Sequence, residues 1–363
     1  MKKTLIALAA LAAAGATLAQ SSVTLYGRMD LGMSQLETTV PGAAPTARTD
    51  AFSLAGAQDT WTASRLGFRG TEDLGGGLRA GFVYEIGINA DRDLLDGTPV
   101  LNNARTRLAN LSLTGGFGTV VVGTFLNSFD TVRGFSPANN NISGANFIAS
   151  HGAAITGVPA DARFSTQVDI RSQNAIAYVS PNFNGFTLSA GTVNERVRNF
   201  DAAGNRTAGA KLQGVLLGAN FTQGPLAVQF AFRDAAVGTG ITPDNDLRDW
   251  GLGARYNFGP AVVSFIYEDG RQTTATARNR FNAWEIGARF PMGAFAPYVT
   301  FGQGEIRTGA ESNDTSGWQV GTTYNLSART WVYAGIGEFQ RDNANGTLRA
   351  QREGFALGLV HTF

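Results

Sequence analysis

The chain has 363 residues and only 16% of them are charged, whereas soluble domains carry about 25%. This shortage of charge disfavours a globular protein with a water-facing exterior. The 29 basic and 28 acidic residues nearly balance, which argues against a general polyanion binder, and the absence of cysteine excludes disulfides and thiolate metal sites.

Residues 1–19 have the pattern of a cleaved secretory signal. Lys2 and Lys3 precede an apolar run that starts at Leu5, and small residues precede Gln20. Cleavage after Ala19 would lower the basic count from 29 to 27 against 28 acids. Beyond this segment no apolar run approaches the roughly 18 residues that a membrane helix needs. If the mature chain enters a membrane, it therefore does so as strands.

Alternation of apolar and polar residues runs through nearly all of residues 20–363. In the segment WEIGARF, which begins at Trp284, every second residue is apolar, and this period predicts β-strands. Sixteen strands are expected, centred near residues 28, 66, 82, 110, 121, 176, 189, 216, 230, 253, 265, 286, 299, 321, 334 and 357. An even number lets the last strand pair with the first, which leaves no exposed edge.

Two kinds of connection alternate between these strands. Tight, turn-like links lie at 74–78, 114–118, 180–185, 222–225, 258–260 and 290–295. Long, polar links are expected at 35–59, 89–103, 127–169, 195–207, 236–248, 270–280, 305–315 and 341–350. Alternating short and long links are typical of a membrane barrel with a turn end and a loop end.

The placement of aromatic residues separates a membrane barrel from a soluble β-sandwich. The apolar face carries aromatic residues near the strand ends, which resembles the two interfacial girdles of a barrel. These residues include Trp250, Phe258, Trp284, Phe290, Trp318 and Tyr324. The predicted fold class is all-β, a sixteen-stranded antiparallel transmembrane β-barrel occupying residues 20–363.

Arginine dominates the basic residues after the signal segment, where Lys211 is the sole lysine. Eight arginines fall in mid-strand: Arg28, Arg65, Arg69, Arg107, Arg171, Arg233, Arg255 and Arg289. An arginine facing lipid at mid-depth costs about 2–4 kcal/mol, so these side chains are expected to point inward. A dry core cannot hold eight charges, whereas a barrel of sixteen strands is wide enough for an aqueous channel.

Five blocks of sequence resemble the general porins of the Gram-negative outer membrane, in particular their β-proteobacterial branch. They are SVTLYGRMDLG at 22–32, SRLGFRGTEDLGGGLRAGFVYE at 64–85, TRLANLSLTGGFGTVVVG at 106–123, AIAYVSPNFNGF at 175–186 and the ending GLVHTF. The resemblance implies a homotrimer of barrels that admits small hydrophilic solutes. It also implies that the third long loop, 127–169, folds into the barrel and narrows it.

The same resemblance suggests which residues line the constriction. Arg65, Arg107 and Arg171 match the basic cluster of the pore wall, Arg69 lies beside them, and Glu85 matches a wall carboxylate. The loop motif Pro-Glu-Phe-Gly-Gly of many relatives is absent, which leaves three loop acids open as the opposing charge: Asp130, Asp161 and Asp169. Thr124 follows Gly123 where relatives often have arginine, so one wall charge is missing.

The ending alternates apolar residues up to a terminal phenylalanine. Phe355, Leu357, Leu359, His361 and Phe363 resemble the signal that the outer-membrane insertion machinery reads. His361 replaces the more usual tyrosine or tryptophan and is expected at the membrane interface. Outer-membrane lipid and lipopolysaccharide are further expected partners.

These features predict an outer-membrane diffusion channel with a modest anion preference, because inward arginines outnumber the inward acids Asp30, Glu85, Glu268 and Glu285. The main alternative is a substrate-specific channel for anionic solutes such as phosphate or carboxylates. A non-conducting barrel that binds other surfaces through its loops is disfavoured by its width. An enzyme is also disfavoured, since the two histidines offer no triad spacing. No metal, cofactor or nucleic acid is expected.

Overall fold

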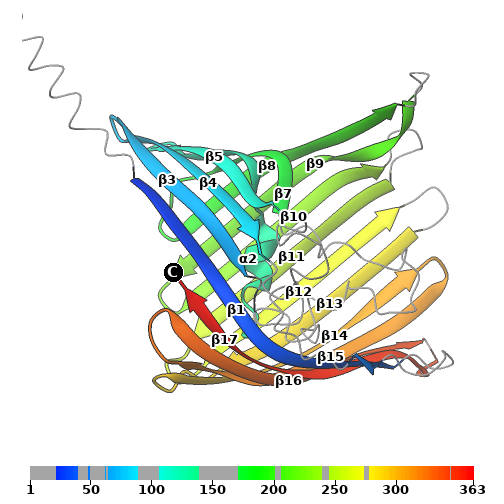
Figure 1. Ribbon diagram of the computed structural model, residues 1–363. Coiled ribbons are helices and arrows are strands. Elements are labelled where there is room, and N and C mark those ends of the chain that lie inside the picture. Colours follow the sequence, from blue (N-terminus) through cyan, green and yellow to red (C-terminus); the bar gives the residue numbers. More distant parts are fainter. Residues whose placement is uncertain are drawn as a thin grey trace, which may run out of the picture.

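The computed structural model describes residues 22–39, 48–49, 62, 64–88, 106–138, 171–200, 206–238, 245–273, 278–343 and 345–363. Within them one antiparallel sheet of seventeen strands closes into a barrel, and one of the strands has only two residues, which leaves sixteen long strands (Figure 1). The fold prediction is confirmed, and the β-sandwich alternative is wrong. The signal segment 1–19 lies outside the described residues.

The long strands contain all of the predicted centres. They are β1 (Ser22–Thr39), β3 (Arg65–Gly75), β4 (Leu78–Gly87), β5 (Thr106–Gly115), β6 (Gly118–Leu126), β7 (Arg171–Val179), β8 (Phe186–Phe200), β9 (Arg206–Gln223), β10 (Leu226–Gly238), β11 (Asn245–Asn257), β12 (Val262–Thr273), β13 (Arg278–Arg289), β14 (Phe295–Thr308), β15 (Glu311–Asn325), β16 (Thr330–Asn343) and β17 (Leu348–Thr362). The short β2 (Arg48–Thr49) pairs with β1.

The barrel closes between its first and last strands. β1 and β17 pair from Arg28 opposite Thr362 to Thr39 opposite Gln351. Tyr333 on β16 strengthens this seam, because its hydroxyl donates a hydrogen bond of 2.9 Å to the buried carboxylate of Asp30 on β1. Its ring lies over Gly358 of β17, where a Cβ atom would collide with it.

Side chains alternate between lipid and lumen as the period-2 pattern predicts. On β13, Ala283, Glu285 and Gly287 are buried inside, while Ile286 is 47% exposed on the outside. The terminal residues follow the same rule: the apolar ones in the assembly signal are exposed, and those between them, such as Ala356 and Val360, are buried. His361 is exposed, and its Nδ1 lies 2.9 Å from the hydroxyl of Thr330.

Several connections predicted to be long are short, which corrects the sequence analysis. The expected loop 305–315 is almost entirely strand, since β14 ends at Thr308 and β15 begins at Glu311. Its polar residues stay in register, with Glu305 opposite Asp314. The backbone ladder does not depend on side-chain polarity, so strands continue past the apolar band, where polarity alone suggested loops. The expected loops at 236–248, 270–280 and 341–350 are shortened in the same way.

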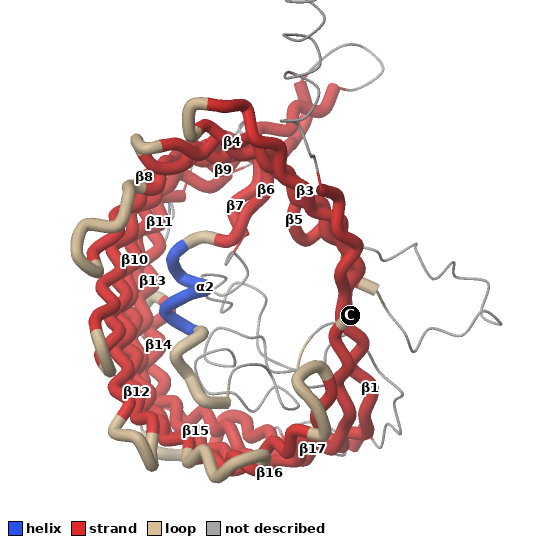
Figure 2. The backbone as a smooth tube through the Cα atoms, turned by 90° about the vertical axis from the view of Figure 1, so that its left-hand side faces the viewer, coloured by secondary structure: helices blue, strands red, loops and turns tan. Residues whose placement is uncertain are grey.

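Among the described residues, one helix lies inside the barrel. α2 (Ser128–Arg133) follows β6 and sits within the ring of strands when the barrel is viewed through its opening (Figure 2). Asn127 caps it, because its side-chain Oδ1 accepts a hydrogen bond of 3.0 Å from the backbone N–H of Phe129. None of the helices in the described part of the chain is long and apolar enough to span a bilayer.

Candidate pore constriction

The inner wall accommodates α2 and the residues after it through glycines that face the lumen. Val132 is fully buried and lies against Gly251 of β11, and Phe135 lies against Gly253 of the same strand. A Cβ atom on Gly253 would approach Phe135 to 2.9 Å, and one on Gly287 of β13 would approach Pro137 to 2.5 Å. The absence of side chains at these inward glycines therefore leaves the space into which the segment 128–138 packs.

Charged residues hold the same segment to the wall. Arg133 at the end of α2 donates two hydrogen bonds, of 2.9 and 3.2 Å, to the carboxylate of Glu268 on β12. The guanidinium of Arg233 lies 5.5 Å from the ring centre of Phe129 and makes a bidentate pair with Asp249 at 2.9 and 2.7 Å. Bidentate arginine–carboxylate pairs are strong and directional, so the pair of Arg133 and Glu268 fixes both the place and the orientation of α2 on the wall.

Glu85 is the centre of a charge cluster on a different part of the wall. Its Oε1 accepts a hydrogen bond of 2.7 Å from Nε of Arg107 and lies 3.7 Å from Nη1 of Arg65. Its Oε2 accepts a hydrogen bond of 3.1 Å from the hydroxyl of Tyr26 on β1. Tyr26 lies flat over Gly67, where a Cβ atom would approach its ring to 2.5 Å. Only 4% of Glu85 is exposed.

A β-bulge turns Arg107 toward Glu85. Glu85 pairs with Leu108 whereas Ile86 pairs with Thr106, so Arg107 is the extra residue between two pairs. Strict alternation with Leu111, which is 67% exposed on the outside, would have directed Arg107 to lipid. The bulge turns this side chain into the charge cluster around Glu85, and bulges commonly redirect side chains in this way.

Asp130 faces the basic cluster from the other side of the lumen. It lies in the first turn of α2 and interacts electrostatically with Arg171, Arg133, Arg107 and Arg65. Burial raises the pKa of Asp130, and the positive charges of these arginines oppose the shift. Asp161 and Asp169, the other two acid candidates, lie outside the described residues.

The chain matches the family of Gram-negative porins over residues 4–344. It is 36% identical to outer membrane porin protein 32 of Delftia acidovorans over 279 residues, which cover 74% of this chain and 69% of that protein. The chain belongs to the Gram-negative porins. It is also 29% identical over 289 residues to an outer membrane porin protein of Bordetella pertussis, with the same two coverages of 74% and 69%.

The fold of this porin matches a solved structure of an anion-selective porin from Comamonas acidovorans. The TM-score is 0.69 at 24% sequence identity, and the match covers 95% of this chain and 100% of the other. Membership of this family makes the porin a multi-pass outer-membrane protein that forms a channel for passive diffusion of small hydrophilic solutes. Family and fold indicate a channel rather than an enzyme.

The structure spreads the remaining arginine candidates over the lumen. Arg28 lies beside the Glu85 cluster, where it donates a hydrogen bond of 2.6 Å to Thr62. The Arg69 guanidinium lies 5.1 Å from the ring centre of Tyr26. Arg255 and Arg289 are separate from this cluster: Arg255 lies 5.0 Å from the ring centre of Phe135, and Arg289 donates a hydrogen bond of 2.6 Å to Thr323.

Sequence reasoning did not single out Arg133, Tyr26 or Asp249. The sequence NSFD at 127–130 does carry a helix-start signal, with an asparagine cap and an acid in the first turn. Arg133 follows in the last turn of that helix. Its pairing with Glu268, 135 positions later, is a tertiary contact that no local pattern reveals.

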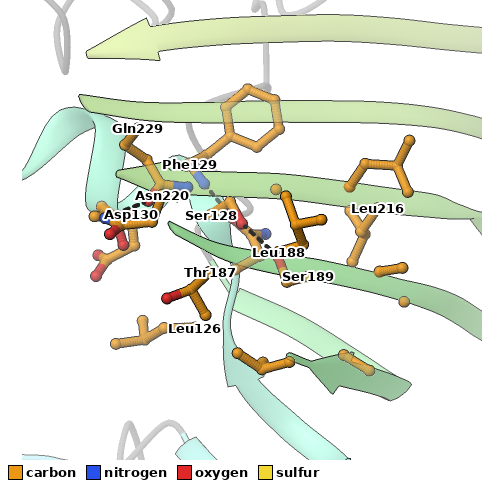
Figure 3. A pocket seen from close by; sticks show the side chains of 18 of the residues that line it. Leu126, Ser128, Phe129, Asp130, Thr187, Leu188, Ser189, Leu216, Asn220 and Gln229 are labelled. Carbon is orange, nitrogen blue, oxygen red and sulfur yellow. Dashed lines mark hydrogen bonds between the residues drawn. The ribbon is translucent and has the colours of Figure 1, made fainter. Parts of the chain in front are cut away.

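A cavity of about 440 Å³ lies between α2 and the wall formed by β6 to β10. Figure 3 shows Ser128 and Ser189 approaching each other at its edge, with their hydroxyls 3.3 Å apart. Asn220 donates a hydrogen bond of 3.1 Å to Gln229 on the same wall. The helix therefore approaches this side through Ser128, and the space beside that contact stays open.

Proposed function

We propose that the porin prefers small anions, and that its selective zone is the gap between Asp130 on α2 and the arginine cluster around Glu85. The observation that carries this proposal is the local imbalance of charge. Apart from Arg133, which pairs with Glu268, five arginines contribute to this cluster or interact with Asp130, against the three carboxylates Asp30, Glu85 and Asp130. These arginines are Arg28, Arg65, Arg69, Arg107 and Arg171. Arginine keeps its charge at any physiological pH, so the imbalance is permanent.

Elementary electrostatics sets the strength of this preference. A unit charge 4 Å away is worth about 1 kcal/mol in water and about 4 kcal/mol at an intermediate dielectric. In a water-filled lumen the lower value applies to a hydrated ion. Such energies change the ratio of anion to cation traffic without excluding either ion, which favours a general pore.

The carboxylates are not equivalent in this proposal. Glu85 is held by Arg107, Arg65 and Tyr26, so it neutralises part of the wall permanently. Asp130 belongs to the seated loop segment and faces the wall across the lumen. The two sides then define a transverse field that orients polar solutes as they pass.

A substrate-specific channel for phosphate or carboxylate solutes is the second candidate. Arg255 and Arg289 extend the basic lining beyond the cluster, and such steps could guide an anionic solute. In that case conductance would show saturable block by phosphate or a small dicarboxylate, whereas an open pore would show none at matched ionic strength.

Alanine replacement of Arg65, Arg107 and Arg171, one at a time, tests the assignment of the selective zone. Each replacement should lower the anion preference measured as a reversal potential across a planar bilayer. Arg329, which is exposed at the turn end, provides a matched control that should leave selectivity unchanged. Selectivity that is insensitive to all three lumen replacements would move the selective zone elsewhere.

We also propose that the porin works as a homotrimer and that residues 1–19 are removed on export. The sequence blocks shared with trimeric porins and the signal pattern support these two proposals. The outward position of Phe355, Leu357, Leu359 and Phe363 leaves them accessible to the insertion machinery during assembly. Sedimentation of the detergent-solubilised protein and mass spectrometry of its N-terminus test the first two points.

A further inference from the structure

The outer face of the barrel carries a row of arginines that faces away from the pore. The strand register places them directly opposite one another across four neighbouring strands, β11 to β14. The row consists of Arg248, Arg271, Arg280 and Arg307, in that order. Each is exposed, and the residues next to them along the strands, such as Asp249, Phe281 and Ile306, are buried inside.

The row lies near the loop end of the barrel. Arg280 is ten residues before Phe290, an exposed aromatic residue at the turn end of β13. Ten residues at about 3.4 Å each, tilted by about 40°, span about 26 Å along the membrane normal. The apolar band of a membrane barrel is about 25 Å tall. The arginines therefore lie at the level of the outer-leaflet headgroups. Tyr267 and Trp284, which are paired across β12 and β13, lie four residues closer to the middle of the membrane.

The two outer members of the row already have partners. Arg248 forms an ion pair with Asp234, and Arg307 donates a hydrogen bond of 2.6 Å to Glu305. The central pair is different: within the described part of the chain neither Arg271 nor Arg280 makes an ion pair with a carboxylate.

The nearest acid to this central pair is itself engaged. Asp269 interacts electrostatically with Arg280 and Arg271 while accepting a hydrogen bond from the Trp250 side chain. Like charges directly opposite each other on neighbouring strands are destabilising. An anion bound between the two guanidinium groups would relieve this repulsion, because it would be attracted by both.

We propose that Arg271 and Arg280, flanked by Arg248 and Arg307, bind a phosphate group on the headgroup of an outer-leaflet lipid. A guanidinium presents paired N–H donors that match phosphate oxygens, and two of them facing each other can hold one phosphate from both sides. The depth of the row favours a lipid over a free anion, because a lipid phosphate is held at that level by its acyl chains. Basic side chains at headgroup depth are a general mode of lipid recognition.

The purified full barrel in detergent micelles provides the test, with its melting temperature followed during a titration with phosphorylated lipopolysaccharide. The variant R271Q/R280Q should need at least about tenfold more lipid for the same rise in melting temperature, since two charge-assisted contacts are lost. R329Q carries the same chemical change at the turn end and should respond as the wild type does. Without lipid the double variant should melt no lower than the wild type, because the like-charge contact is relieved.

Dephosphorylated lipopolysaccharide and inorganic phosphate identify the ligand. The proposal expects little stabilisation from either at concentrations where the phosphorylated lipid saturates. Equal stabilisation by the dephosphorylated lipid, or equal responses of the double variant and the wild type, would overturn it. Equal stabilisation by inorganic phosphate would show a free-anion site instead and would also overturn the lipid assignment. If the double variant does not refold, R280Q alone applies the same criteria.

Discussion

Replacing Glu85 with glutamine removes the carboxylate at the centre of the arginine cluster while keeping the size of the side chain. Glu85 contacts Arg107 at 2.7 Å, Arg65 at 3.7 Å and the Tyr26 hydroxyl at 3.1 Å. The amide oxygen can still accept the hydrogen bond of Arg107, and the amide NH2 group can donate one to the hydroxyl of Tyr26. The change in charge is therefore larger than the change in shape.

The size of the effect follows from Coulomb's law. For a hydrated ion about 7 Å away in water, one unit charge is worth about 0.6 kcal/mol. Removing this negative charge lowers the energy of an anion and raises the energy of a cation by about that amount each. The two changes add, so the permeability ratio of anions to cations should rise by about eightfold. Screening at about 0.1 M salt reduces the interaction by roughly half, so an increase of about threefold to eightfold is expected.

Reversal potentials of single channels in a gradient of potassium chloride measure this ratio directly. Glu72→Gln is the matched control, since Glu72 is exposed on the neighbouring strand, β3, on the face opposite to the inward residues Arg69 and Asp73. Its ratio should equal that of the wild type. An E85Q channel with unchanged selectivity, or with greater cation preference, would refute the assignment of Glu85 to the selective zone.

Three further predictions concern the loop segment, its acid and the barrel seam. Gly287→Val should force Pro137 away from the wall and into the lumen, which should lower the single-channel conductance, and the overpacking should destabilise the barrel by about 1–3 kcal/mol. Ala288→Val, on the opposite face of β13, should leave the conductance unchanged. Equal conductance of both variants would contradict the packing of Pro137 on Gly287. The anion preference of the wild type should rise as the pH falls, because burial raises the pKa of Asp130 and its negative charge is lost at a higher pH than that of an ordinary aspartate. Asp130→Asn should remove this part of the pH dependence. Identical pH profiles of the reversal potential in variant and wild type would argue against this role of Asp130. Tyr333→Phe removes a hydrogen-bond donor from the buried carboxylate of Asp30 and should lower the free energy of unfolding in urea by about 1–3 kcal/mol. Tyr256→Phe, at an exposed outer position, should have little effect. Equal unfolding of the two variants would contradict a stabilising role of Tyr333 at the seam.

The strands could be predicted from the sequence because the membrane makes the two faces of each strand chemically different. On β13 the contrast between exposed Ile286 and buried Glu285 is visible directly in the alternation of residue types. Closure also followed from an even strand number, because an unpaired edge in lipid is too costly to persist.

The details of the site depended on contacts that alternation does not encode. Arg107 reaches Glu85 through a bulge, although its parity with Leu111 points to lipid. The pair of Arg133 and Glu268 joins residues that are 135 positions apart. Loop lengths were overestimated for a related reason, since polar residues beyond the apolar band remain paired in β14 and β15.

Glycines of the inner wall leave space for the segment 128–138 that lies inside the barrel (Figure 2). Gly251, Gly253 and Gly287 could be read from the sequence as inward positions without side chains, but their purpose becomes clear only with Val132, Phe135 and Pro137 seated on them. A larger residue at these places would displace the segment that carries Asp130. The position of the proposed selective zone therefore depends on the packing of the wall.

The reversal potential of the wild-type channel in a tenfold gradient of potassium chloride tests the central claim most directly. A lumen dominated by fixed guanidinium charge predicts a potential with the sign of chloride permeation. A potential with the sign of potassium permeation would contradict the account.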